Sequence, residues 1–126
     1  MLAFYPKDRT GGCTAELTKF RDQYTTLFGD RAGRDVVVVP ISADGLVSHA
    51  AWAKESNYPF ALAADTGLTA ITAYGSRMEK MPLSKRTVFV IGKDGRVKYR
   101  DLQFNALSEE EYSRLRDEVK KAESAS

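Results

Sequence analysis

Residues 2–28, LAFYPKDRTGGCTAELTKFRDQYTTLF, contain a short apolar run, a polar turn and a longer segment with helical spacing. Residues 2–5 predict a β-strand that Pro6 ends, because proline cannot donate to a strand ladder. Residues 7–12 are small or polar and predict a turn. Apolar side chains then recur along one face of a predicted helix that Gly29 closes. These side chains are Leu17, Phe20, Tyr24, Leu27 and Phe28.

The next segment continues the alternation of strands and helices. The four valines of residues 36–39 predict a strand buried on both faces of a parallel sheet, and Pro40 marks its end. Further on we predict, in turn, a helix, a short strand, a short helix and a polar loop, over residues 46–54, 60–64, 68–74 and 76–85.

The last part of the chain adds a hairpin and a closing helix. Residues 87–91 and 97–102 predict two strands joined by a Lys-Asp-Gly turn. Ser108 and Glu111 predict a capping box before the last helix. The order β-α-β-α-β-α-β-β-α predicts an α/β protein of thioredoxin-like fold, with a mixed central β-sheet flanked by helices. We expect one domain over residues 1–126.

Composition and charge limit the classes of partner. The chain has 126 residues, with 19 basic and 17 acidic side chains and a net charge of +2. So small an excess predicts neither nucleic acid nor a membrane as a partner. No apolar run is long enough to span a bilayer and residues 1–5 are too short for a signal-peptide core, so we expect a cytoplasmic protein. Cys13 is the only cysteine, which excludes an internal disulfide and a cysteine-built metal site.

The position of Cys13 favours a chemical role. It follows the first strand and begins the first helix, at the carboxyl end of a strand, where open α/β sheets place their sites. Unpaired backbone N–H groups at a helix start favour the thiolate, which is the reactive form of cysteine. Gly11 and Gly12 predict an open polar turn, whereas an inert buried cysteine is the competing interpretation.

The residues around Cys13 resemble the active-site signature of the peroxiredoxins. Pro6, Thr10 and Cys13 match its pattern Pro-x-x-x-Thr/Ser-x-x-Cys, and the flanking residues resemble the bacterioferritin-comigratory-protein (PrxQ) branch of that family. Matches in the expected order continue to about residue 104. They are Ile41-Ser42-Ala43-Asp44, Ser48-His49, Pro59-Phe60 and Arg86-Thr87-Val88-Phe89-Val90-Ile91.

The resemblance implies a thiol-dependent peroxidase that uses no cofactor and no metal. Cys13 would attack hydrogen peroxide, with organic hydroperoxides as a further substrate class, and become a sulfenic acid. Thr10 would accept from the peroxide and donate to the thiolate or the reacting oxygens, Arg86 would stabilise the developing charge, and Pro6 would shield the sulfur. Glu16 would orient Arg86. We expect these groups to converge on one anion-sized pocket that solvent reaches.

Two departures from the family shape these expectations. Many members of the branch carry a resolving cysteine five residues after the first one, where this chain has Thr18. The resemblance then implies a one-cysteine cycle with an external thiol reductant, which is a thioredoxin, a glutaredoxin or a small thiol. Members also have a β-hairpin and a further strand before the first strand found here. We expect those elements to be missing, through truncation or with compensation by pairing to another chain as a homodimer; otherwise the protein is a monomer.

Other interpretations of the same residues remain open. Thr10 could close its turn through a local hydrogen bond, and His49 is predicted to be a partly exposed helix residue. Trp52 is predicted to be part of the core. The alternative function is a non-catalytic thioredoxin-fold relative that acts as a peroxide sensor or interaction module. A disulfide oxidoreductase is disfavoured because efficient exchange needs a second nearby cysteine.

Overall fold

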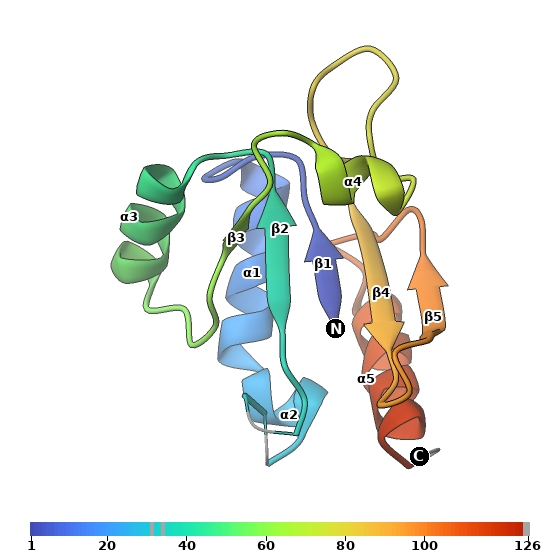
Figure 1. Ribbon diagram of the computed structural model, residues 1–126. Coiled ribbons are helices and arrows are strands. Elements are labelled where there is room, and N and C mark those ends of the chain that lie inside the picture. Colours follow the sequence, from blue (N-terminus) through green and yellow to red (C-terminus); the bar gives the residue numbers. More distant parts are fainter. Residues whose placement is uncertain (31, 34, 125–126) are drawn as a thin grey trace.

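The computed structural model describes residues 1–126 with the exception of residues 31, 34, 125 and 126. Helices and strands alternate along the described residues up to the closing hairpin, as predicted, except that α2 follows α1 directly (Figure 1). In chain order the elements are β1 (Leu2–Phe4), α1 (Gly11–Asp22), α2 (Tyr24–Phe28), β2 (Val39–Ser42), α3 (Leu46–Ser56), β3 (Ala63–Ala64), α4 (Thr69–Ala73), β4 (Thr87–Ile91), β5 (Val97–Asp101) and α5 (Glu109–Ser124).

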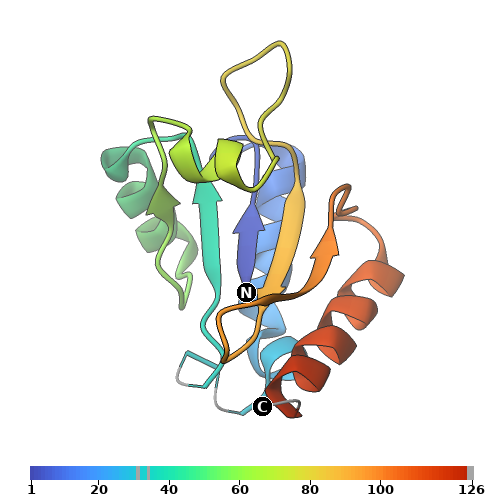
Figure 2. The same ribbon diagram turned by 45° about the vertical axis from the view of Figure 1, so that its right-hand side comes forward.

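The described strands form a mixed sheet in the order β3-β2-β1-β4-β5. Strand β1 pairs in parallel with β2, and β2 with β3, whereas β4 is antiparallel to both β1 and β5. Helices α1, α2 and α5 lie behind the sheet in Figure 1 and α4 lies in front, an arrangement that the rotated view in Figure 2 also shows. The predicted α/β class with a mixed sheet between helices is confirmed.

Alternation along the strands divides the core between the two faces of the sheet. Successive side chains of a strand point to opposite faces. Accordingly, Ala3 and Tyr5 join the core beneath α1 and α5, whereas Phe4 joins a cluster beneath α4. Trp52 is buried in the first of these cores, as predicted. Each face of β1 therefore carries buried apolar side chains.

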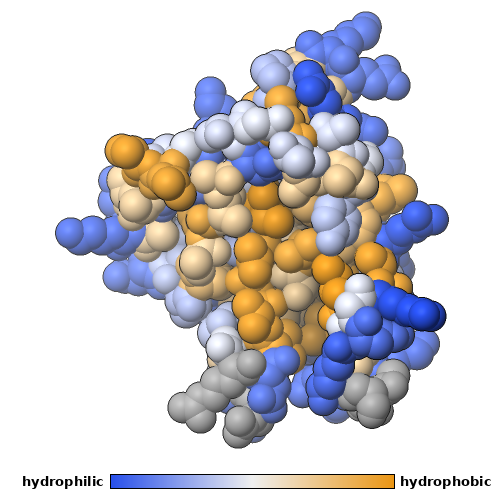
Figure 3. Space-filling view, in the orientation of Figure 1, coloured by the Kyte–Doolittle hydropathy of each residue, from blue (hydrophilic) through white to orange (hydrophobic). Residues whose placement is uncertain are grey.

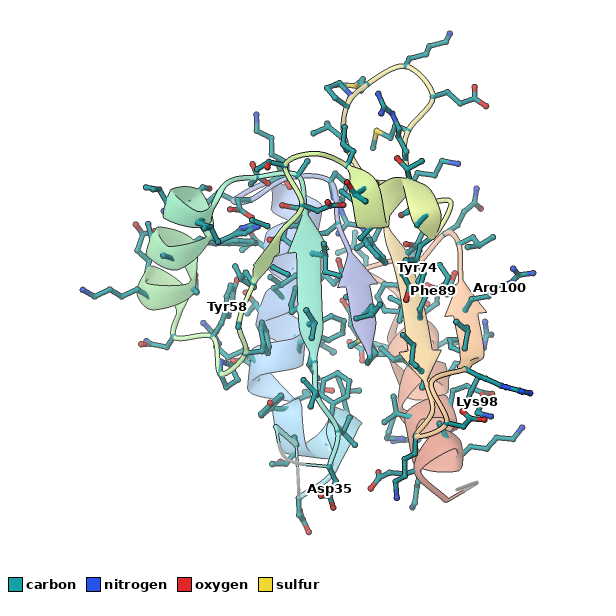
Figure 4. The ribbon with its side chains drawn as sticks, in the orientation of Figure 1. Asp35, Tyr58, Tyr74, Phe89, Lys98 and Arg100 are labelled. Carbon is teal, nitrogen blue, oxygen red and sulfur yellow. The ribbon has the colours of Figure 1, made fainter. Side chains whose placement is uncertain are left out.

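The face of the sheet beneath α4 is rich in aromatic side chains. Tyr74 and Phe89 lie next to one another there (Figure 4), with ring centroids 4.9 Å apart. Phe4 packs edge-on against Phe89, with 5.9 Å between the centroids. Beyond α4 the same face presents further apolar side chains over β2, β1 and β4 (Figure 3).

The predicted strand of residues 36–39 is displaced along the chain. The strand found is β2, Val39–Ser42, because its partner β1 begins at Leu2 and aligns it with Val39. Val37 is exposed, so this valine run is not buried on both faces. Pro40 lies inside β2 rather than at its end. Since β3 begins pairing only at Ile41, the missing N–H of Pro40 removes no ladder bond.

Three boundaries also differ from the sequence predictions. The helix predicted up to Phe28 is divided at Gln23, whose ψ of 33° interrupts the helix and lets Phe28 pack against Phe20. The predicted strand of residues 60–64 is reduced to β3. In place of a capping box with Ser108, the Glu111 carboxylate accepts from the N–H of Asn105, within the turn that precedes α5. None of the helices in the described part of the chain is long and apolar enough to cross a bilayer.

Candidate active site around Cys13

Cys13 lies in the first turn of α1, and its side chain is 0% exposed. Leu17 and Phe20 follow it at helical spacing and are equally buried, so the three side chains share the face that α1 turns to the sheet. The expected position in an open, solvent-exposed turn is therefore wrong. The helical periodicity that marked Leu17 and Phe20 as core residues already includes Cys13.

Arg86 is the residue immediately before β4, and its side chain reaches the sulfur of Cys13. Its Nη2 donates to Cys13 Sγ at 3.4 Å, and its Nη1 donates to Glu16 Oε1 at 2.7 Å. Arg86 lies 73 positions after Cys13 and 70 positions after Glu16 in the chain. The planar guanidinium fork holds both acceptors at once, which the point charge of a lysine could not do. The structure thus brings together three of the predicted site residues.

Glu16 is a buried carboxyl group at 0% exposure. Burial raises its pKa to about 7, and the neighbouring Arg86 charge and hydrogen bond limit the rise. Its Oε2 is buried without a hydrogen-bond partner. For Arg86, burial lowers the pKa, but Glu16 and Cys13 more than compensate and the pKa rises above its usual value. The site therefore holds a permanent cation beside a carboxyl group that titrates near neutral pH.

Thr10 and Pro6 flank the cysteine on the loop that enters α1. Thr10 is the N-cap residue, and its carbonyl accepts the first helical bond from Thr14 N at 2.8 Å. Its hydroxyl donates to the carbonyl of Lys7 at 2.8 Å, so Thr10 does close its turn through a local hydrogen bond. This bond uses the hydroxyl hydrogen and leaves the oxygen lone pairs available. Pro6 is half-buried and lies two residues after β1.

Sequence reasoning missed the contribution of Gly12. A Cβ atom at this position would lie 2.7 Å from Arg86 Nη2, whereas one at Gly11 would meet nothing within 4 Å. Gly12 therefore lets the guanidinium approach the sulfur over the backbone. Its place directly before the cysteine was the only signal in the sequence.

A second polar cluster was also missed. His49 was expected to be partly exposed, but it is 2% exposed and its Nδ1 lies 2.8 Å from Asp8 Oδ2. The prediction is wrong because α3 turns this side chain toward the loop before Cys13 rather than toward solvent. No local spacing relates two residues that lie 41 positions apart. Among the described residues, no group of three His, Cys, Asp or Glu side chains is placed to hold a metal ion.

Comparison with known proteins identifies relatives of the chain. The model of the AhpC/TSA family matches residues 1–100. Peroxiredoxin Bcp of Bacillus subtilis is 33% identical over 103 residues, which cover 77% of this chain and 63% of the relative. The chloroplastic peroxiredoxin Q of Triticum aestivum is 37% identical over 100 residues, which cover 79% of this chain and 44% of the relative. The chain thus spans less than two thirds of the length of either relative.

Solved structures extend the comparison to the fold. The crystal structure of the peroxidoxin BcpB of Mycobacterium tuberculosis matches with a TM-score of 0.80 and 27% identity, over 95% of this chain and 77% of that one. This match confirms the thioredoxin-like arrangement predicted from the order of the elements. The resemblance to Bcp and PrxQ proteins is confirmed as well, and the chain belongs to the AhpC/TSA family.

Proposed function

We propose that this protein is a thiol-dependent peroxidase whose reactive group is Cys13. The observation that carries the proposal is the Arg86 guanidinium, which donates to Sγ while Glu16 holds it in place. Hydrogen peroxide is the proposed substrate, with organic hydroperoxides as a further class. The names of the Bcp and peroxiredoxin Q relatives support the same activity.

The proposed step transfers one oxygen atom to sulfur. The Cys13 thiolate attacks the terminal oxygen of the hydroperoxide, the S–O bond forms and the O–O bond breaks. The leaving oxygen takes a proton and departs as water or an alcohol, while sulfur is oxidised to the sulfenic acid. Negative charge moves from sulfur to the leaving oxygen, and Arg86 lies where it can stabilise that charge.

The flanking residues have supporting roles in this proposal. The lone pairs of Thr10 Oγ1 accept from the peroxide O–H, because its own hydrogen is already donated to Lys7. Pro6 shields the thiolate from water. Glu16 orients the guanidinium so that Nη2, rather than Nη1, faces the sulfur.

The second half of the cycle needs a thiol from outside the chain. Cys13 is the only cysteine, and Thr18 stands where many relatives have their resolving cysteine. An external thiol would attack the sulfenic acid to form a mixed disulfide and release water. A second thiol would then release Cys13 and form the disulfide of the reductant. The proposed reductant is a thioredoxin, a glutaredoxin or a small thiol.

The burial of Cys13 places a condition on this cycle. Because Sγ is covered, peroxide reaches it only when side chains around it, with Arg86 among the candidates, move aside. The same burial is the observation that favours the alternative, a non-catalytic relative that acts as a peroxide sensor or interaction module. The peroxidase oxidises Cys13 rapidly and completes repeated cycles with an external thiol, whereas an interaction module does not react rapidly and a sensor does not turn over.

The deciding experiment is stopped-flow measurement of Cys13 oxidation by hydrogen peroxide, with the sulfenic acid trapped by dimedone. We expect wild-type protein to react far faster than a free small-molecule thiol, and Arg86→Ala to react about 10²-fold more slowly than wild type. Cys13→Ser is the control for trapping at other sites. A folded wild-type protein that reacts no faster than the free thiol would overturn the peroxidase proposal in favour of the non-catalytic one.

A further inference from the structure

The loop of residues 6–10, here called the cysteine loop, joins β1 to the helix that carries Cys13. Arg9 in this loop has a φ of 63°, a left-handed conformation that residues other than glycine adopt only at a cost. Such a conformation persists when surrounding contacts determine it. The residue immediately before Arg9 is Asp8, and its contacts show what holds the loop.

Asp8 is a buried carboxylate with donors on both oxygens. Tyr5 donates to its Oδ1 at 2.6 Å, and Ser48 donates to its Oδ2 at 2.6 Å. His49 Nδ1 lies 2.8 Å from the same Oδ2. The backbone N–H of Asp8 donates to Asp44 Oδ2 at 2.8 Å. The middle of the cysteine loop is thus tied to β1, to α3 and to the turn between β2 and α3.

His49 has polar partners at both of its ring nitrogens. Nδ1 faces the Asp8 carboxylate, and Nε2 lies 3.1 Å from the carbonyl oxygen of Ala63 in β3. Tyr5 Oη also lies 3.4 Å from Nδ1, so polar partners hold the ring of His49 on both sides. The other ionisable groups here are Asp44 and Tyr5; burial, followed by the bond to Asp8, raises the Tyr5 pKa, so its hydroxyl remains a donor.

We propose that His49 and Asp8 form a positioning pair that holds the cysteine loop, and through it Thr10 and the start of α1, in the arrangement that Cys13 needs to react with peroxide. Neither residue touches the sulfur or the proposed peroxide position. They act through the loop because α3 and β3 fix His49, which in turn fixes Asp8 two residues before Thr10. A buried, closely spaced polar pair suits this task, since removing one partner leaves the other without its hydrogen bond in a buried place. The proposal rests on the peroxidase function for its kinetic consequence, but not for the placement of the loop.

The first arm of the test compares two reactions of Cys13 in wild type, His49→Gln and Asp8→Asn. With the pair broken, the loop no longer holds Thr10 and the start of α1 in place, so the site loses its alignment and the buried sulfur becomes easier to reach. We expect the rate with hydrogen peroxide to fall about tenfold or more, because alignment is lost. We expect the rate of alkylation by iodoacetamide to rise, because this reagent needs access but not Arg86 or Thr10. Because general unfolding would also expose the buried sulfur, the two rates are compared with those of a core variant of lowered stability outside the polar cluster.

Val119→Ala is the matched control, since it shortens a buried side chain on α5 outside the polar cluster. Both rates should stay within about twofold of wild type in this variant. The His49→Gln/Asp8→Asn double variant should be no slower with peroxide than the slower single one, because residues that act as a unit are not additive. If His49→Gln fails to fold, Ser48→Ala removes one donor from Asp8 and should change both rates in the same directions by less.

Hydrogen exchange of the peptide that covers residues 6–14 separates this proposal from the proposed function. We expect faster exchange of these amides in His49→Gln, including those that now donate to Asp44 and to Thr10. If wild type itself reacts with peroxide no faster than a free thiol, the peroxidase proposal fails, and exchange and alkylation alone decide the placement of the loop. Unchanged exchange together with unchanged alkylation in His49→Gln would overturn the positioning pair.

Discussion

At the scale of single residues, the site depends on a buried carboxyl group beside an arginine. Glu16 lies on the core face of α1, one turn after Cys13, and one of its oxygens has no hydrogen-bond partner. A buried charge without full compensation is costly, so the group keeps its proton to a higher pH than an exposed glutamate does. Arg86 lies between this carboxyl group and the sulfur. The ionisation of Glu16 therefore affects both the stability of the fold and the charge around Cys13.

The pH dependence of stability tests this account of Glu16. Its pKa is about 7 in the folded protein and 4.5 in the absence of perturbation. Between these values the folded state holds a proton that the unfolded state has lost, so the free energy of unfolding declines as pH rises through this window. The decline attributable to Glu16 is about 3 kcal/mol.

Urea denaturation of wild type and Glu16→Gln from pH 4 to pH 8 measures this decline, because contributions from all other groups cancel in the difference. We expect wild type to lose stability relative to Glu16→Gln as pH rises. Glu79→Gln, at an exposed loop position, is the control and should run parallel to wild type. Parallel curves for Glu16→Gln as well would show that this carboxyl group titrates at its ordinary pKa.

The planar guanidinium of Arg86, which donates to two acceptors at once, gives a second prediction at the scale of single residues. Arg86→Lys keeps the positive charge but cannot reach Glu16 and Cys13 together. We expect its rate of sulfenic acid formation to fall by about 10²-fold, close to that of Arg86→Ala. Stopped-flow oxidation by hydrogen peroxide measures the rate. A rate near that of wild type would mean that charge alone, and not the fork, assists the reaction.

At the scale of elements, the start of α1 contains two residues without side chains. Two glycines precede Cys13, and only the second lies beneath the guanidinium of Arg86. In a helix, alanine is favoured over glycine by about 1 kcal/mol. Alanine at either position therefore has the same effect on helix formation, but only alanine at position 12 affects the site.

Gly12→Ala and Gly11→Ala form a matched pair. The new Cβ in Gly12→Ala would push against Arg86 Nη2, which is the flexible end of a side chain, so the protein should remain folded. We expect the peroxide rate to fall about tenfold or more as the guanidinium leaves the sulfur. In Gly11→Ala the rate should stay at the wild-type value. Equal rates in the two variants would exclude a requirement for the close approach over Gly12.

Several elements could be predicted because their signals are local. The strand β4, the helix α4 and the turn between β4 and β5 follow from β-branched runs, helical spacing and an Asp-Gly pair. The start of β2 could not be predicted this way. Val36–Val39 has the stronger β propensity, yet the ladder begins at Val39 because Leu2 is the first residue that β1 offers opposite it. Pairing, rather than propensity, decides where a strand begins.

At the scale of the whole molecule, the sheet separates one apolar cluster beneath α1 and α5 from another beneath α4. Leu115 is fully buried in the first and Ile71 is fully buried in the second. The clusters lie on opposite faces of the sheet, so side chains in one have few partners in the other. Truncations on the two faces should then act independently.

Leu115→Ala and Ile71→Val test this independence. We expect the free energy of unfolding to fall by about 2–5 kcal/mol for Leu115→Ala and by about 1 kcal/mol for Ile71→Val. The double variant should lose the sum to within about 0.5 kcal/mol. Chemical denaturation of the three variants measures these losses. A larger departure from the sum would mean that the sheet transmits packing changes from one face to the other.

The sequence by itself determined the α/β class, the order of strands and helices and the likeness to the AhpC/TSA family, because periodicity, turn residues and motifs are local properties of the chain. It also marked Cys13, Thr10, Arg86 and Pro6 as candidates, with Glu16 as an auxiliary residue. Only the tertiary structure decided that Cys13 is covered, which nitrogen of Arg86 faces Glu16 and which faces the sulfur, and that His49 pairs with Asp8. These facts depend on contacts between residues 41 to 73 positions apart, which arise only when the sheet brings β1, α3 and β4 together.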